Sequence, residues 1–150
     1  MRRTIKTAIA CAALALAGCG SKTALDEYYT QVVTLPNGKE IRAEVMADRT
    51  DMMRGMMFRD SLAPDRGMLF IHDRPDRHTY WMYQVRIPLD IVWLDGNRRI
   101  VEISANTPPC KSQASKCPQY GGKEMSQYVL ELAGGVAAQH GLRLGEQLTF

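Results

Sequence analysis

The chain has 150 residues, and its 19 lysines and arginines outnumber its 16 aspartates and glutamates. Residues 1–18 hold three of the basic residues and no acid, so residues 19–150 carry 16 charges of each sign. A balanced chain without a basic stripe lacks the electrostatic footprint of a nucleic-acid-binding protein, so no nucleic-acid partner is expected. The length suits a single domain with a buried core, which we expect at residues 30–150.

Residues 1–18 have the pattern of a bacterial export signal, in which basic residues precede an apolar run too short to span a bilayer permanently. The run ends in the letters LAGC, which resemble a lipobox. We therefore expect an acylated Cys19 to anchor the protein in a membrane. Gly20, by resemblance to enterobacterial sorting, implies an outer-membrane lipoprotein that faces the periplasm. A soluble exported protein with a chance Cys19 is the alternative.

The cysteines fit an exported protein. Cys11 would leave with the signal and Cys19 would become the anchor, which leaves Cys110 and Cys117 in an oxidising compartment. We predict a disulfide between these two, which would stabilise the fold by about 2 to 3 kcal/mol in the loop-entropy model. The alternatives are half of a metal site, which lacks a second ligand pair nearby, and a redox pair, for which the spacing is wrong.

The first elements after a short tether at residues 19–29 are a hairpin and a helix. Apolar runs at residues 29–35 and 40–46 flank the letters PNGK, a hairpin signal with Asn-Gly at its centre. Residues 47–62 have helix-forming composition, with Asp48 or Thr50 as the expected N-cap.

The rest of the chain predicts mainly strands. Strands are expected at residues 67–71, 78–85, 89–94, 98–104 and 127–132, with a short helix at 134–141 that Gly141 closes and a last edge strand at 146–150. Several runs are apolar on both alternating faces, as in central strands covered on two sides. About six to eight short strands and two short helices predict a mainly β fold, either a sandwich or a squashed barrel.

Six stretches then carry a resemblance to a known family: RGMMFRDSL, GMLFIHD, YWM, IPLDIVWLD, IVEI and YVLELAGGVAAQHGLRLGE. In order and spacing they resemble the domain of unknown function 192 family, whose signature is similar to G-L-M-x-R, G-M-L-F, W-M, I-P-L-D and V-L-E-L. The resemblance covers about residues 30–150 and implies an all-β, jelly-roll-like domain with an unsettled biochemical role. The family usually follows Trp-Met with a basic residue, Asn and Thr. Here these positions are Tyr83, Gln84 and Val85, which would make a polar site more apolar.

The stretch HTYWMYQVRIPLDIVWLD, at residues 78–95, concentrates aromatic and charged side chains. We expect Ile91 and Trp93 to lie in the core. Tyr80, Trp81 and Asp90 are expected near the strand ends beside Pro88, where a pocket can open.

The first functional hypothesis is non-catalytic binding of a cell-envelope glycan or another small polar ligand. Apolar walls with a few polar groups are typical of such sites. The predicted ligand-binding residues are Arg59, Tyr80, Trp81, Asp90 and Glu131. The alternative makes Asp90 a structural acid that caps a turn or pairs with Arg59 or Arg86. Replacing Asp90 by Asn would weaken binding in the first case and unfold the protein in the second.

Two other function classes stay open. Asp90 and Glu131 would be the acid and base of a carbohydrate-active enzyme. Seven methionines with His72 and His78 suggest a Cu(I) carrier, although methionines also fill gaps in cores. These are Met46, Met52, Met53, Met56, Met57, Met68 and Met82, of which only Met52 and Met53 are additions to the family motifs. The motifs of serine, cysteine and zinc hydrolases do not occur, so the sequence assigns no catalytic residue, metal ligand or cofactor, and it leaves the oligomeric state open.

Overall fold

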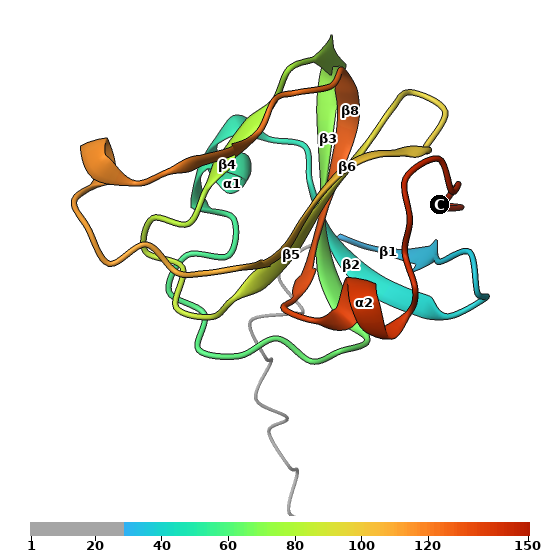
Figure 1. The fold of residues 1–150 in the computed structure, drawn as a ribbon, viewed down its shortest axis with the longest axis horizontal. Helices are drawn as coiled ribbons and strands as arrows, with labels where there is room; N and C mark the ends of the chain where they lie inside the picture. Colours follow the sequence, from blue (N-terminus) through green and yellow to red (C-terminus); the bar gives the residue numbers. More distant parts are fainter. Residues whose placement is uncertain (1–28) are drawn as a thin grey trace, which may run out of the picture.

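A computed structural model describes residues 29–150. The expected signal peptide with Cys11, the expected anchor Cys19 and most of the tether lie outside these residues. The described part is mainly β, as predicted, and contains a six-stranded sheet in the order β1-β2-β3-β8-β5-β6 and a two-stranded sheet, β4-β7. Figure 1 shows α1 and β4 on one side of the large sheet and α2 on the other.

Strands make up most of the elements along residues 29–150, and the helices between them are short. In chain order, the elements are β1 (Thr30–Thr34), β2 (Glu40–Met46), α1 (Arg49–Arg54), β3 (Arg66–Asp76), β4 (Thr79–Trp81), β5 (Leu89–Leu94), β6 (Ile100–Thr107), the 3-10 turn η2 (Ala114–Lys116), β7 (Gln119–Gly121), β8 (Ser126–Ala133) and α2 (Val136–Gln139).

The predicted hairpin and the first helix both form. β1 and β2 pair antiparallel around a turn in which Gly38 has a φ of 82°, a left-handed conformation that glycine adopts without strain. Asp48 is the N-cap of α1, because its side chain accepts a hydrogen bond from the backbone N–H of Thr50 at 2.8 Å. α1 lies in the crossover between β2 and β3, which are the parallel pair in the sheet, whereas the other neighbouring strands are antiparallel.

Both faces of the large sheet are covered, as the apolar runs predicted. The first core lies on the α2 side and consists of Val33, Leu35, Ile41, Ala43, Leu69, Val92, Leu94, Ile100, Leu130, Leu132, Val136, Ala137, Leu142 and Leu148. The second core lies on the α1 side and consists of Met46, Met56, Met68, Phe70, Met82, Val85, Leu89, Ile91, Trp93 and Val129. Ile91 and Trp93 are thus buried, as expected.

Two predicted strands are wrong in extent. The run at 78–85 forms a strand only over β4 and then turns, since Gln84 has a left-handed φ of 58° and the backbone N–H of Val85 bonds back to Met82. Residues 146–150 make isolated bridges instead of a strand, one from Thr149 to Thr34 of β1 and one from Gln147 to Arg99. The C-terminal segment therefore contacts both ends of the strand order without closing the sheet into a barrel.

The predicted disulfide is confirmed. Cys110 and Cys117 are bonded, with their Cα atoms 5.7 Å apart, and η2 lies in the loop that they close. The backbone of Cys110 is tied to the turn after β4, because its N–H donates to the carbonyl of Met82 at 3.0 Å. Within residues 29–150, no helix has the length and apolar character needed to cross a membrane.

Candidate functional site

An apolar cavity of about 620 Å³ lies between helix α1 and strand β4. Most of its wall consists of methionine and aromatic side chains, and its polar groups are few. Its lining residues are Thr50, Met52, Met53, Arg54, Met57, His72, Thr79, Tyr80, Trp81 and Tyr83. We call this space the apolar cavity.

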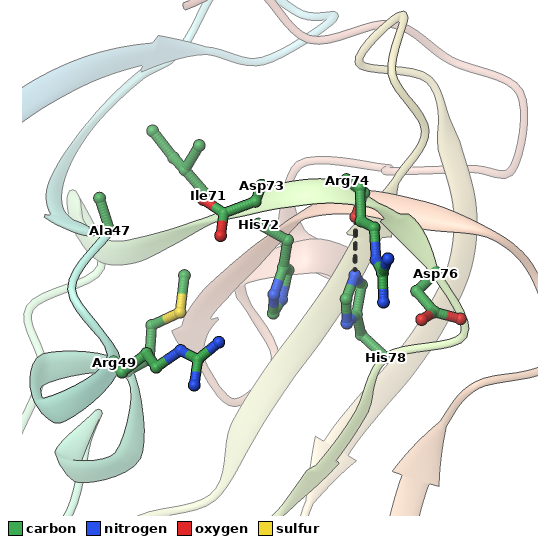
Figure 2. Close-up of a pocket in the computed structure, with 9 residues that line it drawn as sticks. Ala47, Arg49, Ile71, His72, Asp73, Arg74, Asp76 and His78 are labelled. Atoms are coloured by element: carbon green, nitrogen blue, oxygen red, sulfur yellow. Dashed lines mark hydrogen bonds between the residues drawn. The ribbon is translucent and has the colours of Figure 1, made fainter.

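A second cavity, of about 540 Å³, opens between α1 and the outer half of β3. Figure 2 shows the Arg49 side chain pointing toward the rings of His72 and His78 across this space. Its lining residues are Ala47, Arg49, Met52, Ile71, His72, Asp73, Arg74, Asp76 and His78. Met52 and His72 line this polar cavity and the apolar cavity alike, so the two spaces meet at this pair. We call the two cavities together the α1 cleft.

A stack of rings forms the floor of the α1 cleft. The imidazoles of His72 and His78 are nearly parallel, with ring centroids 3.5 Å apart. Nε2 of His72 lies 3.1 Å from the Tyr80 hydroxyl. Nε2 of His78 lies 3.3 Å from the carbonyl oxygen of Arg74, a contact marked by the dashed line in Figure 2. The indole N–H of Trp93 donates to the backbone carbonyl of His78 at 2.9 Å. Both histidines are therefore held in place from the core side.

The buried surroundings fix the protonation state of two of these rings. Burial, followed by the neighbouring His78, lowers the pKa of His72 from 6.5 to about 4, so its imidazole is neutral at neutral pH. Burial, followed by the charge of Glu131, raises the pKa of Tyr80 well above its usual value, so its hydroxyl keeps its proton. The pair can share a hydrogen bond without carrying charge.

Of the predicted ligand-binding residues, Tyr80 and Trp81 line the apolar cavity. Trp81 is 37% exposed, and its ring lies 5.3 Å from that of Tyr83, measured between centroids. Arg59, Asp90 and Glu131 do not line the α1 cleft. The structure thus places the two aromatic residues in the wall of the α1 cleft and leaves the three charged ones outside that wall.

Asp90 is fully buried on the α2 face of the sheet. Its Oδ1 accepts a hydrogen bond from the backbone N–H of Asn106 at 2.6 Å, and its Oδ2 accepts one from the N–H of Ala137 at 2.7 Å. The structural alternative is correct that Asp90 has partners, but these are backbone amides and not Arg59 or Arg86. Asp90 joins β5 to β6 and to the start of α2.

Arg59 and Glu131 lie on the opposite face, with Glu44. Arg59 forms a two-pronged ion pair with Glu44, with N–O distances of 2.5 and 2.6 Å. Glu44 and Glu131 flank Met68 in register on the neighbouring strands β2 and β8. Burial raises the pKa of Glu131 to about 8 despite the opposing effect of Arg59, and Oε2 of Glu131 has no hydrogen-bond partner among residues 29–150. Asp90 and Glu131 face away from each other, so the enzyme hypothesis loses its acid–base pair.

The methionines divide into two groups, which the sequence separated only in part. Met46, Met56, Met68 and Met82 are buried in the second core, as the core-filling alternative predicts. The other three, Met52, Met53 and Met57, line the apolar cavity. The sequence pointed to Met52 and Met53 because they do not belong to the family motifs. Their proximity to His72, however, depends on the fold.

The comparisons with known proteins give the family. A model of domain of unknown function 192 (DUF192), described as "Uncharacterized ACR", matches residues 32–150. The chain belongs to this family. No curated protein matches the chain. DUF192 membership confirms the resemblance found in the sequence motifs.

Two solved structures are similar to this DUF192 chain. One is a protein of unknown function from Novosphingobium aromaticivorans DSM 12444, with a TM-score of 0.74 and 29% identity over 99% of this chain and 100% of that chain. The other, a putative transcription regulator from Sinorhizobium meliloti 1021, has a TM-score of 0.73 and 29% identity over 81% of this chain and 94% of that chain. They support the fold of the DUF192 domain.

The positions at which this chain departs from the DUF192 signature lie at cavities. Tyr83, where the family usually has a basic residue, lines the apolar cavity. Gln84 and Val85 line a separate cavity of about 460 Å³ with Phe58 and the disulfide residue Cys110. Tyr83 adds a third aromatic side chain to the wall of the α1 cleft, beside Tyr80 and Trp81.

Proposed function

We propose that the protein is an exported, membrane-anchored lipoprotein whose DUF192 domain binds a small ligand in the α1 cleft without converting it. The observation that carries this proposal is the composition of the apolar cavity, which combines Trp81, Tyr83 and three methionines with no carboxylate in its wall. Its volume of about 620 Å³ lies within the range of small-molecule sites, which have apolar walls and a few placed polar groups.

The cavity favours a ligand with one apolar ring face and several polar groups. The aromatic wall offers a flat face for such a ring. Thr50, Arg54 and Thr79 supply hydroxyl and guanidinium groups around it. A sugar ring has this character, so a glycan of the cell envelope is the first ligand to test.

Binding without catalysis is supported by the position of the carboxylates. Glycoside hydrolysis needs two carboxyl groups on either side of one bond. Asp90 and Leu132 form a cross-strand pair and Ile91 pairs with Glu131, so the side chains of Asp90 and Glu131 alternate onto opposite faces. They cannot reach the same substrate atom.

The test is tryptophan fluorescence of the purified full-length protein, titrated with soluble peptidoglycan fragments and with neutral disaccharides. The chain has two tryptophans, and Trp93 is only 1% exposed, so a ligand-induced change reports on Trp81. We expect saturable binding that Trp81→Ala weakens by roughly thirty-fold, equal to about 2 kcal/mol.

Because Trp81→Ala removes the reporter, its affinity is measured by calorimetry. Phe58→Ala is the matched control, since Phe58 is an exposed aromatic residue that lines a different cavity. Equal weakening by both substitutions, or no saturable binding of any tested saccharide to the wild-type protein, would overturn the proposal for this ligand class.

A further inference from the structure

Sulfur and nitrogen donors gather where the two cavities of the α1 cleft meet. Met52 and His72 line both spaces, and Met53 and Met57 line the apolar cavity beside them. We propose that this junction binds Cu(I), with Met52 and His72 as donors and a third thioether from Met53 or Met57. This inference uses the same cleft but does not rest on the saccharide ligand proposed above.

The exposure of Met52, Met53 and Met57 favours a role for them other than core packing. Met46, Met56, Met68 and Met82 are at most 2% exposed and fill the second core. Met52 and Met57 are half-buried, and Met53 is 77% exposed on helix α1. Met52 packs against the margin of the core with one side and lines the cleft with the other. Met52 can therefore take part in a site of the cleft while it still packs against the core.

The donor set selects the metal. Thioether and imidazole are soft or borderline ligands that suit Cu(I), whereas Zn²⁺ sites use thiolate, imidazole or carboxylate, and Ca²⁺ and Mg²⁺ sites use oxygen. The apolar cavity has no carboxylate or thiolate in its wall, and Asp73 and Asp76 lie on the polar side, where both are exposed. Within residues 29–150, no three histidine, cysteine, aspartate or glutamate side chains gather as a metal site. The junction therefore favours a soft monovalent ion.

The ring of His72 is oriented by a neighbour, as in established metal sites. Tyr80 holds Nε2 of His72 at 3.1 Å. If Nε2–H donates to the hydroxyl oxygen, the lone pair of the neutral ring lies on Nδ1, which becomes the metal donor. Tyr80 is then a positioning residue for His72.

His78 is not expected to share the same ion. A metal ion binds an imidazole nitrogen in the plane of the ring, and the rings of His72 and His78 are stacked with only 8° between their planes. Metal ions bound in the planes of two parallel rings 3.5 Å apart would therefore occupy separate positions. His78 therefore supports the face of His72, and the remaining coordination falls to thioethers.

The first experiment is an anaerobic Cu(I) titration of the purified full-length protein in competition with bicinchoninate. We expect the wild-type protein to take up one Cu(I). Met52→Leu and His72→Gln should each weaken binding by more than about ten-fold, and Tyr80→Phe by roughly ten-fold through the loss of orientation. The matched controls are Met125→Leu and His140→Gln, because neither residue lines the α1 cleft.

Thermal melts of each variant show whether a substitution disturbs the fold. The second measurement avoids this problem because it uses the wild-type protein. Its methionine methyl groups are labelled with carbon-13 and followed by NMR while Ag(I), a diamagnetic substitute for Cu(I), is added. We expect the methyl signal of Met52 and that of Met53 or Met57 to shift, and the signals of Met68, Met82 and the other core methionines to stay. Uniform shifts of all exposed methionines, or no competition with bicinchoninate, would overturn the inference. Failure of saccharide binding alone would leave it standing.

Discussion

Glu131 shares a buried face with one cation and a second acid. Arg59 is matched by Glu44 in a two-pronged ion pair, so one charge of each sign is balanced. Ionised Glu131 would add a second negative charge to the same buried region. Burial disfavours the ionised form and raises the pKa of Glu131 to about 8, although Arg59 acts in the opposite direction.

This shift makes stability depend on pH. Because the pKa of Glu131 is raised from 4.5 in the unfolded chain to about 8 in the folded one, the folded state holds the proton more tightly. The stability that this proton contributes is fully present below pH 4.5 and is lost as the pH rises to about 8. The loss is on the order of a few kcal/mol.

Glu131→Gln should remove this dependence, because the amide does not ionise. We expect the free energy of unfolding of the variant, measured in urea at pH 5, 6, 7 and 8, to change less with pH than that of the wild type. At pH 8 the variant should be the more stable of the two. Parallel pH profiles for the two proteins would contradict the raised pKa.

For Asp90, in contrast to Glu131, we expect replacement of the carboxylate by an amide to destabilise the fold. Both of its carboxylate oxygens accept buried backbone N–H groups, and an asparagine offers only one oxygen. Asp90→Asn should therefore lose roughly 1 to 3 kcal/mol, because one amide, of Asn106 or Ala137, is left without an acceptor. Ligand binding in the α1 cleft should not change, since Asp90 does not line it. If Asp90→Asn weakened ligand binding without any change in stability, Asp90 would again be a candidate ligand-binding residue.

At the scale of helices and strands, features that depend on neighbouring residues were predicted correctly from the sequence. Features that depend on residues far apart in the chain were not. The turn at Asn37-Gly38 and the N-cap Asp48 depend on neighbouring residues, and both form as expected. The run at 78–85 was predicted as one strand because its side chains alternate. It breaks at Gln84, whose left-handed φ has no glycine or proline beside it to signal a turn.

The candidate site was predictable only in part, for the same reason. Tyr80 and Trp81 stood out because aromatic residues near a strand end are visible in the sequence. The meeting of Met52 with His72 depends on the crossover that places α1 over β3, and the parallel pairing of β2 with β3 is a tertiary feature. Likewise, the opposite orientations of Asp90 and Glu131 follow from the register between β5 and β8.

The pairing of β4 with β7 gives a prediction at this scale. β7 ends at Gly121, which has a φ of 79°, and a Cβ there would lie 2.3 Å from the Trp93 ring. Gly121→Ala should displace β7 or the indole beneath it. Gly145→Ala is the matched control, because Gly145 has a similar φ of 84° but no atom within 4 Å of such a Cβ.

Both variants share the conformational cost of a left-handed alanine, about 1 kcal/mol. The excess loss in Gly121→Ala therefore measures the contact with Trp93. Denaturant melts followed by tryptophan fluorescence should show a lower midpoint for Gly121→Ala than for Gly145→Ala. Equal midpoints would mean that β7 moves away at no cost.

At the scale of the whole molecule, the prediction concerns the anchor. Acyl chains on Cys19 would supply strong bilayer affinity, and no helix in residues 29–150 is suited to cross a membrane. Cys19→Ser should therefore move the protein from the membrane fraction to the soluble fraction of cells. Cys11→Ser is the matched control, since Cys11 lies within the apolar run of the expected signal. A Cys19→Ser protein that still sediments with membranes would contradict acylation as the means of attachment.

The bridge between Thr34 and Thr149 has a consequence for the order of folding. β1 is among the first described parts of the chain to be synthesised, yet its outer partner is the segment around Thr149, and β3 similarly waits for β8. Contacts between such distant residues form slowly, because a long loop must close before they stabilise anything. The six-stranded sheet cannot be completed until β8 has been made, and the bridge to Thr34 also needs the segment around Thr149. A chain that is to cross a membrane in unfolded form would therefore lack its complete sheet, and stay able to pass through a narrow channel, until both segments have been made.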